Sequence, residues 1–442
     1  MSRLTRLGPS LKRLTARPPL PPPAQRAFRY EQLTELTLPV AFTLLEGGIV
    51  GVIAAKIYQV SPFVLAVITA APMFGNLSSY FWSRMANART KVRFANAVQI
   101  ATIACVLAIA VAPVNQAGAA LLVLGMILSR LLITGIITVR SVVWSLNYDR
   151  TVRARTTGRL QILTSLVTVV ISSLVGPLLD QNPESFRWVY VSGAVFGMLG
   201  VYFFSRVNVI GEARHRVLER RNQQESSPEE KVGFMEILKR DKHYARYQIY
   251  QFTAGAANMV IEAPLVYLIT RELNAGYTES IAMTMVIPFA VSMVTLPIWA
   301  SYLDRVHVAE FRARQSVLWV ISQALLWIGA LLGSLWWIGV SRFVLGIARG
   351  GGALAWQLGH NDFADQKALS AYMGIHVTLT GVRGAIMPFL GMVLYIGFFD
   401  QPGIGAHLFA LAALLSMISW WGFRRLHRDM QAQKATGQIT ES

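Results

Sequence analysis

The sequence contains little charge and almost no cysteine. Only 14% of its 442 residues are Asp, Glu, Lys or Arg, whereas an average soluble domain has about a quarter. Its single cysteine, Cys105, excludes a disulfide framework within the chain and a metal site built on several cysteines. The composition is therefore not that of an ordinary soluble domain or of a small disulfide-rich one.

Long polar stretches are also scarce, and apolar runs fill most of the chain, which is 54% hydrophobic. About 20 apolar residues form a helix that crosses a bilayer. A helix is expected because a backbone inside lipid must satisfy its own hydrogen bonds. The sequence predicts an all-α integral membrane protein with twelve transmembrane helices. They are expected at roughly 36–57, 62–83, 94–113, 119–142, 160–179, 188–204, 245–269, 279–302, 316–334, 336–358, 371–397 and 405–423.

Acidic residues are outnumbered, and the formal net charge is +18. In a soluble protein this excess would suggest a nucleic-acid partner. Here most Lys and Arg residues lie in the two terminal tails and in the loops after every second helix, while the opposite loops hold only Lys56, Arg187 and Arg271. This distribution follows the positive-inside rule. It predicts a multi-pass protein of the cell (inner) membrane with both termini cytoplasmic, in contact with the lipid bilayer and not with nucleic acid.

The longest polar stretch, 206–244, divides the apolar segments into two sets of six. We therefore expect two six-helix halves, 36–205 and 245–423, joined by a cytoplasmic linker at 206–244. The remaining segments are a basic, proline-rich cytoplasmic tail at 1–35 and a cytoplasmic tail at 424–442.

The two halves repeat pairs of landmarks at equal spacing. An Arg and a Trp stand 14 residues apart in the fourth helix of each half, and a Glu and a Pro stand 26 residues apart in the first and second helices. The pairs are Arg130–Trp144 and Glu46–Pro72 in the first half, and Arg342–Trp356 and Glu262–Pro288 in the second. Matching landmarks in the same order indicate an internal duplication and predict two pseudo-symmetric halves.

Two parallel six-helix repeats joined by a cytoplasmic linker resemble the major facilitator superfamily. The family has a loop motif after its second helix, which Ser83–Lys91 resembles in the first half and Leu303–Arg305 in the second. Its arginine motif in the fourth helix is echoed at Arg130 and at Arg342. A motif of proton-exchanging exporters is present only as Gly176-Pro177, so these motifs do not identify a subfamily.

The resemblance implies secondary transport by alternating access, with the first and fourth helices of each half lining a central cavity. It also implies a cytoplasmic gate formed by the two loop copies. The candidate gate residues are Arg84, Arg89, Lys91, Asp304 and Arg305. Topology alone would also place basic residues in these loops, so a purely topological role stays open.

Two acidic residues are expected well inside the membrane, Glu46 and Glu262, at matching places in the two halves. A buried charge needs a partner or a cavity. We expect Glu46 to pair with Arg130 and Glu262 to pair with Arg342, as sites whose protonation biases the opening of the cavity. The alternative is a pair of static ion bridges that hold helices together.

Further polar residues recur at helical spacing and are expected to converge on the same cavity. They are Gln251, Asn258, Arg349, His376 and Arg383, and Arg140 is a further intramembrane arginine on the fourth helix of the first half. Because arginines outnumber the intramembrane acids, we expect an anionic solute, which guanidinium groups bind through two hydrogen bonds. Polar packing between helices is the alternative for each stripe.

The predicted function is a proton-coupled secondary transporter of a small anionic solute. It would act as a monomer, use the proton gradient as its energy source and need no cofactor. An exporter of hydrophobic or amphipathic compounds remains an alternative, as does a membrane receptor or assembly partner that transports nothing. No nucleophile or metal set points to an enzyme. The sequence does not identify the solute or the direction of transport.

Overall fold

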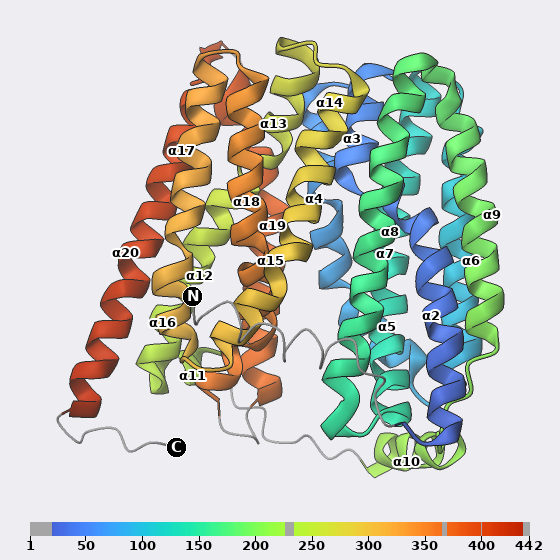
Figure 1. The fold of residues 1–442 in the computed structure, drawn as a ribbon. Coiled ribbons are helices and arrows are strands. Elements are labelled where there is room, and N and C mark those ends of the chain that lie inside the picture. Colours follow the sequence, from blue (N-terminus) through green and yellow to red (C-terminus); the bar gives the residue numbers. More distant parts are fainter. Residues whose placement is uncertain (1–19, 226–233, 365–368, 399, 436–442) are drawn as a thin grey trace, which may run out of the picture.

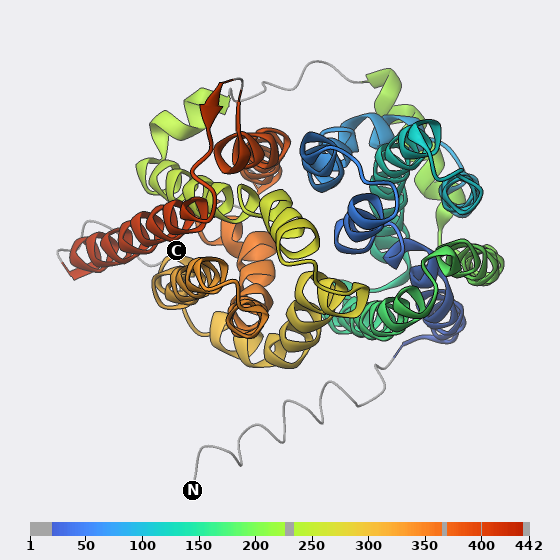
Figure 2. The ribbon, with the colours of Figure 1, turned by 90° about the horizontal axis from the view of Figure 1, so that it is seen from above.

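A computed structural model of the chain describes residues 20–225, 234–364, 369–398 and 400–435. It shows two groups of long helices standing side by side (Figure 1), and the view along the bundle separates them clearly (Figure 2). The only strands in the described residues are the antiparallel β1 (Gly397–Phe398) and β2 (Gln401–Pro402). The fold is therefore all-α, as predicted.

The helices divide at the segments that connect the two groups. The first group contains α2 (Pro22–Thr43), α3 (Gly47–Lys56), α4 (Pro62–Leu77), α5 (Ser79–Ala86), α6 (Lys91–Ala110), α7 (Gln116–Asn147), α8 (Arg150–Gln181), η2 (Pro183–Ser185) and α9 (Phe186–Ser205). The connecting helices are α10 (Glu212–Glu225) and α11 (Phe234–Arg240). The second group contains α12 (Lys242–Met259), α13 (Glu262–Tyr267), η3 (Leu268–Glu272), α14 (Tyr277–Ile281), η4 (Ala282–Val286), α15 (Ile287–Leu303), α16 (Val308–Gln315), α17 (Val317–Leu331), α18 (Leu335–Leu358), η5 (Gly359–Asp362), α19 (Leu369–Ile396) and α20 (His407–Ala435).

Eight helices of the described chain are long and apolar enough to cross a membrane, and the bent pair α4 and α5 forms a ninth span. The helices α17, α18 and α20 run beside them through the bundle (Figure 1). Together these helices of the described chain fit the twelve transmembrane segments that the hydropathy predicted.

The first helix begins at Pro22, so its predicted start at residue 36 is wrong. Proline at the first helical position costs no hydrogen bond, because that N–H has no partner inside the helix. The buried face continues through Ala24, Ala27, Glu31 and Glu35. This spacing of three and four residues belongs to a packed helix, although the segment is too polar to stand out as a membrane span.

The first helix of each half is broken part-way along its length. Residues 44–46 interrupt the first helix between α2 and α3, just before Gly47 and Gly48. Residues 260–261 interrupt the corresponding helix of the second half between α12 and α13. Such breaks free backbone groups inside the membrane, which is tolerated only where protein or water satisfies them. Both breaks lie beside an expected site residue, Glu46 or Glu262.

The polar contacts between the two halves lie at one end of the bundle. We call the end that carries α10 and α11 the linker end and the opposite end the far end (Figure 1). At the far end Lys56 Nζ donates to the Ala275 carbonyl at 2.5 Å, and Asp180 accepts from the backbone N–H groups of Tyr277 at 2.7 Å and Thr278 at 2.9 Å. No hydrogen bond or ion pair between described residues joins the halves at the linker end.

Candidate functional site

Arg130 and Glu46 form the predicted ion pair at the break in the first helix. Arg130 Nη1 donates to Glu46 Oε1 at 3.1 Å, and its Nη2 lies 3.0 Å from Oε2. The same Nη2 also donates to the Leu45 carbonyl at 2.5 Å, a group that the break leaves outside the helix ladder. Glu46 is the N-cap residue of α3, where a negative charge also meets the positive end of the helix dipole.

The corresponding pair in the second half is absent, so that prediction is wrong. Arg342 on α18 is only 3% exposed. Among the described residues it forms no ion pair and no hydrogen bond, and its Nε and Nη1 atoms are buried without a partner. Glu262 is exposed at the start of α13 and attracts Arg342 only across a longer distance. Both halves therefore have an arginine at the same landmark, but in the described residues only Arg130 has a carboxylate and a carbonyl as partners.

Arg349 lies one heptad after Arg342 on α18 and adds a second positive charge nearby. Its Cζ stands 4.1 Å from the centre of the Phe289 ring on α15, which is cation–π geometry. The carboxylate of Glu262 also lies close enough to act on the charge of Arg342. This region of the second half therefore has more positive than negative charge.

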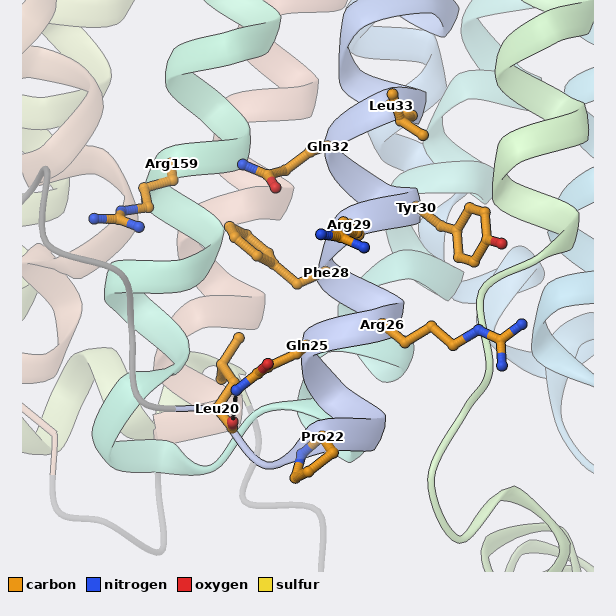
Figure 3. Close-up of a pocket in the computed structure, with 10 residues that line it drawn as sticks. All are labelled: Leu20, Pro22, Gln25, Arg26, Phe28, Arg29, Tyr30, Gln32, Leu33 and Arg159. Atoms are coloured by element: carbon orange, nitrogen blue, oxygen red, sulfur yellow. Dashed lines mark hydrogen bonds between the residues drawn. The ribbon is translucent and has the colours of Figure 1, made fainter.

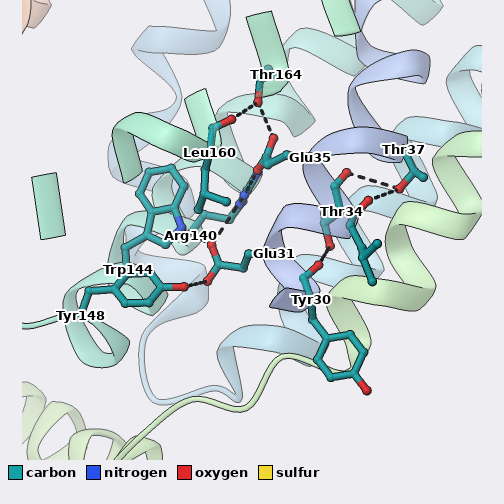
Figure 4. A network of polar contacts seen from close by, with 11 residues as sticks. Tyr30, Glu31, Thr34, Glu35, Thr37, Arg140, Trp144, Tyr148, Leu160 and Thr164 are labelled. Atoms are coloured by element: carbon teal, nitrogen blue, oxygen red, sulfur yellow. Dashed lines mark hydrogen bonds and ion pairs between the residues drawn. The ribbon is translucent and has the colours of Figure 1, made fainter. Parts of the chain in front are cut away.

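Arg140 is engaged by two glutamates that the sequence analysis placed in the tail (Figure 4). Glu31 and Glu35 on α2 are 0% and 3% exposed. Arg140 Nη2 pairs with Glu35 Oε1 and lies 3.9 Å from Glu31 Oε2. These buried carboxylates were missed because the first helix was expected to begin at residue 36. Their spacing of four residues on a helical pattern was the available signal.

The remaining carboxylate oxygens of this network are also hydrogen bonded. Trp144 Nε1 donates to Glu31 Oε2 at 2.5 Å and Tyr148 Oη donates to Oε1 at 3.1 Å. Thr164 Oγ1 on α8 donates to Glu35 Oε2 at 2.5 Å. The network thus joins α2, α7 and α8, and all four carboxylate oxygens have a partner within it.

Arg383 and Gln251 meet between α19 and α12, as expected. Arg383 is 3% exposed, and its Nη1 donates to the Gln251 carbonyl at 2.5 Å. A Cβ at Gly255 would stand 2.0 Å from Arg383 Cζ, so only glycine leaves room for the guanidinium against α12. Arg312 on α16 lies near enough for its charge to repel Arg383, and no acid pairs with either one in the described residues.

His376 lies two turns before Arg383 on α19 and is 2% exposed. Its Nδ1 lies 3.2 Å from Gln248 Oε1, while its Nε2 has no partner among the described groups. The Trp356 ring stands 5.3 Å from the imidazole, and Trp356 Nε1 donates to Thr380 Oγ1 at 3.2 Å. The stripe of His376, Thr380 and Arg383 is therefore a continuous polar face inside the second half.

Asn258 does not join this face. Its Oδ1 accepts from Gln323 Nε2 on α17 at 2.9 Å, and Ser416 Oγ on α20 donates to the same glutamine at 2.5 Å. Asn258 therefore serves polar packing between helices, which was the alternative considered for the stripes. The spacing along the helix predicted that these polar residues share one face of it. It did not predict which neighbouring helix that face would contact.

Of the five candidate gate residues, only Lys91 is buried. Its Nζ lies 2.8 Å from Glu219 on the connecting helix α10, and Glu212 of α10 accepts from the Lys91 backbone N–H at 2.6 Å. The other four lie exposed at the linker end, in both halves: Arg84, Arg89, Asp304 and Arg305. The first copy of the motif therefore holds α10 against its own half, and no described contact links it to the second copy.

The sequence model of the Major Facilitator Superfamily matches residues 40–314. The chain belongs to the major facilitator superfamily. It is therefore a transporter of the membrane that handles small molecules, built on the twelve-helix fold of this superfamily. No curated protein matches the sequence.

Solved superfamily structures show the same fold at low identity. The nucleoside transporter NupG superposes with a TM-score of 0.63 at 14% identity, over 92% of this chain and 99% of that one. A D-xylose-proton symporter gives 0.67 at 12% identity, over 90% and 97%. The human organic anion transporter MFSD10 (TETRAN) gives 0.58 at 14% identity, over 91% and 100%. At these identities the likeness shows the fold alone.

Proposed function

We propose that this superfamily member is a secondary transporter that carries a small anionic solute by alternating access and is driven by coupled proton movement. Transport, not catalysis, is its activity, and it needs no cofactor besides the proton gradient. It acts as a monomer in the cell (inner) membrane. The linker end, with its basic residues and the two ends of the described chain at Leu20 and Ala435, faces the cytoplasm in accordance with the positive-inside rule.

The observation that carries the anionic solute is the contrast between Arg130 and Arg342. In the first half the guanidinium has a carboxylate and a carbonyl as partners. In the second half the guanidinium at the same landmark is buried with unpaired N–H groups and a second arginine nearby. A buried, unsatisfied cation is costly. A carboxylate or phosphate of the solute would supply the hydrogen bonds that Arg342 lacks.

Proton coupling is supported by the position of Glu46. The side chain is 34% exposed, so protons have access to it, while it pairs with Arg130 and stands at the N-cap position of α3 beside the break. Protonation would remove the charge that holds Arg130 and loosen the tie between the first and fourth helices. Such a change shifts the equilibrium between the two conformations of a transporter by the difference between its effects on their free energies. A D-xylose-proton symporter and a human organic anion transporter have similar folds, and this likeness supports the proposal.

The test is ligand-dependent stabilisation of the purified full chain against a panel of small anions, cations and neutral amphiphiles. A ligand at ~100 times its dissociation constant stabilises the folded state by about 2.7 kcal/mol if it binds only that state. We expect an anion to raise the melting temperature of the wild type but not of Arg342→Gln. Arg305→Gln is the control, because it removes the same charge from the exposed linker end.

If only hydrophobic compounds stabilise the protein, the exporter of amphipathic compounds becomes the better function, and the arginines are then structural.

Proton coupling is tested with the stabilising anion in reconstituted vesicles. Wild-type uptake should depend on an imposed pH gradient, and Glu46→Gln should transport without that dependence. Unchanged gradient dependence in Glu46→Gln would remove Glu46 as the coupling residue.

A further inference from the structure

All four carboxylate oxygens of the Arg140 network have a partner inside the first half (Figure 4). The acids are Glu31 and Glu35 on α2, and the donors come from the fourth and fifth helices of that half. An internal duplication predicts a counterpart of this network in the second half, at the same distances from the shared landmarks.

The counterpart lacks both acids. The first helices of the two halves correspond with an offset of 216 residues, from position 46 to position 262, and α2 and α12 end with the same offset, at 43 and 259. Gln251 therefore takes the place of Glu35, and Tyr247 takes the place of Glu31. Both replacements are uncharged side chains, so the anions of the first network have no equivalent at these positions.

The counterpart still contains buried cations. Arg383 and Arg312 are 3% and 4% exposed, and both lie close enough to the Tyr247 hydroxyl for their charges to act on it. Arg383 also donates to the Gln251 carbonyl at 2.5 Å and to Thr380 Oγ1 at 3.3 Å. Two guanidinium groups thus lie together where the first half has its carboxylates.

This cluster is incomplete in the part of the chain that the structure describes. The Nε atoms of both arginines, Oε1 of Gln251 and Nε2 of His376 are buried without a hydrogen-bond partner. Asp362 lies within range of Tyr247, but it is exposed and its Oδ2 accepts from the Val308 N–H at 2.7 Å. Buried cations without an anion are costly, and a bound anion would reduce that cost.

The cluster is separate from the proposed solute site. Trp356 donates to Thr380 Oγ1 at 3.2 Å and follows Arg342 by 14 residues on α18. At 1.5 Å per residue this spacing is about 20 Å along the helix. Trp356 is partly exposed, so the cluster is not sealed from solvent.

The cavity at the start of α2 has no such arrangement of cations. Its volume is about 930 Å³, and Arg26, Arg29 and Arg159 are among its lining residues. Arg26 and Arg159 point to opposite sides (Figure 3). These arginines therefore do not meet on one ligand.

We infer that the cluster around Arg383 and Arg312 is a carboxylate-binding site of the second half. A carboxylate from solution takes the place that Glu31 and Glu35 take in the first half, and it accepts from the two guanidinium groups. The bound carboxylate braces α12, α16 and α19 as the glutamates brace α2, α7 and α8. The inference goes beyond the proposed function, because it rests on the comparison of the two halves and not on Arg342.

The experiment measures thermal stabilisation of the purified full chain at constant ionic strength. The probes are propionate, succinate and benzoate, with propionamide and benzamide as uncharged analogues and inorganic phosphate as a different anion. Gln251→Glu places a carboxylate where the first half has Glu35, and Arg383→Gln removes a cation of the site. Gln357→Glu is the matched control for the added charge, because this position is exposed on α18 beside Trp356.

At least one carboxylate should stabilise the wild type, while the amides should not. Gln251→Glu should melt at a higher temperature than the wild type in buffer without carboxylate, and it should no longer respond to the probe. Gln357→Glu should respond as the wild type does. Arg383→Gln should raise the apparent dissociation constant by about 10- to 100-fold, as expected when a charged hydrogen-bond partner is lost.

A carboxylate response that survives in both Gln251→Glu and Arg383→Gln would overturn the site, and so would the absence of any response in the wild type. Tighter binding of phosphate than of every carboxylate would overturn the assigned ligand class. A response that is lost in Arg342→Gln but kept in Arg383→Gln would assign the carboxylate to the proposed solute site instead. If Gln251→Glu does not fold, the comparison of Arg383→Gln with Arg342→Gln decides between the two sites.

Discussion

At the scale of residues, the described structure distributes buried charge unequally between the halves. In the first half Glu46 faces Arg130, and Glu31 and Glu35 share Arg140. In the second half Arg312, Arg342 and Arg383 are 4%, 3% and 3% exposed and pair with no described acid. An ion pair between two helices holds them together. A buried arginine without an acidic partner is costly, and an anionic ligand would reduce that cost. In the two proposals the second set provides the anion sites, Glu46 and Arg130 provide the proton coupling, and the Arg140 network braces the first half.

Glu35→Gln should destabilise the protein strongly. The change leaves the Arg140 guanidinium buried next to Glu31 alone, and breaking a buried pair from one side costs about 3–5 kcal/mol. The check is the unfolding free energy or melting temperature of the purified variant in detergent. Glu184→Gln is the control, because that side chain is 59% exposed. A loss no larger than that of the control would show that the network is not a structural brace.

At the scale of elements, close helix contacts surround the breaks in the first helix of each half. A Cβ at Gly391 on α19 would stand 1.8 Å from the Val260 carbonyl, which lies in the break between α12 and α13. The backbone at Val260 cannot move aside for an added methyl group as the end of a flexible side chain can. The approach of α19 to this break therefore requires glycine at position 391.

Gly391→Ala should cost about 1–3 kcal/mol in folding stability because the extra methyl group forces α19 away from the break. Gly374→Ala on the same helix is the matched control, since nothing lies within 4 Å of a Cβ there. That control should be neutral or stabilising by about 0.5–1 kcal/mol, because alanine favours a helix over glycine. Melting temperatures of the two variants decide the comparison, and equal values would contradict the packing described here.

The connecting helix α10 is held to the first half by a buried charge pair. Glu219→Gln would leave the Lys91 ammonium with the Ala86 carbonyl as its main partner. We expect α10 to detach more often and trypsin to cut sooner at the arginines of α10. Glu236→Gln on α11, an exposed position, is the control. Identical cleavage rates in limited proteolysis would rule out a holding role for Glu219.

Much of the fold was predictable because bilayer thickness and hydrogen bonding leave few choices for an apolar run. The repeat of landmarks located Glu46 and Arg130 in facing helices, and their pairing followed. The start of the first helix was not predictable from hydropathy, so Glu31 and Glu35 were missed. The direction in which Asn258 points depends on how α12 is rotated against α17, and periodicity along one helix does not contain that information.

At the scale of the whole molecule, the halves are joined at the far end and unjoined, in the described residues, at the linker end. A secondary transporter must also have a state in which this pattern is reversed. An anion that bridges Arg342 to the opposite half would favour that second state only if it binds it more tightly. Ligand-driven reversal is therefore the central requirement of the account.

The most direct measurement is the distance between spin labels across the two halves by double electron–electron resonance. Cys105→Ser removes the one native thiol. Labels at Ser83 and Asn361 report on the linker end, and labels at Glu184 and Leu332 report on the far end; all four positions are exposed. The ligand is the anion that gives the largest stabilisation of the wild type.

Without ligand, we predict a short distance at the far end and a long one at the linker end. The anion should shorten the linker-end distance and lengthen the far-end distance, and Arg342→Gln should abolish both changes. If an anion that binds leaves both distances unchanged, or moves them in the same direction, alternating access driven by this site is contradicted.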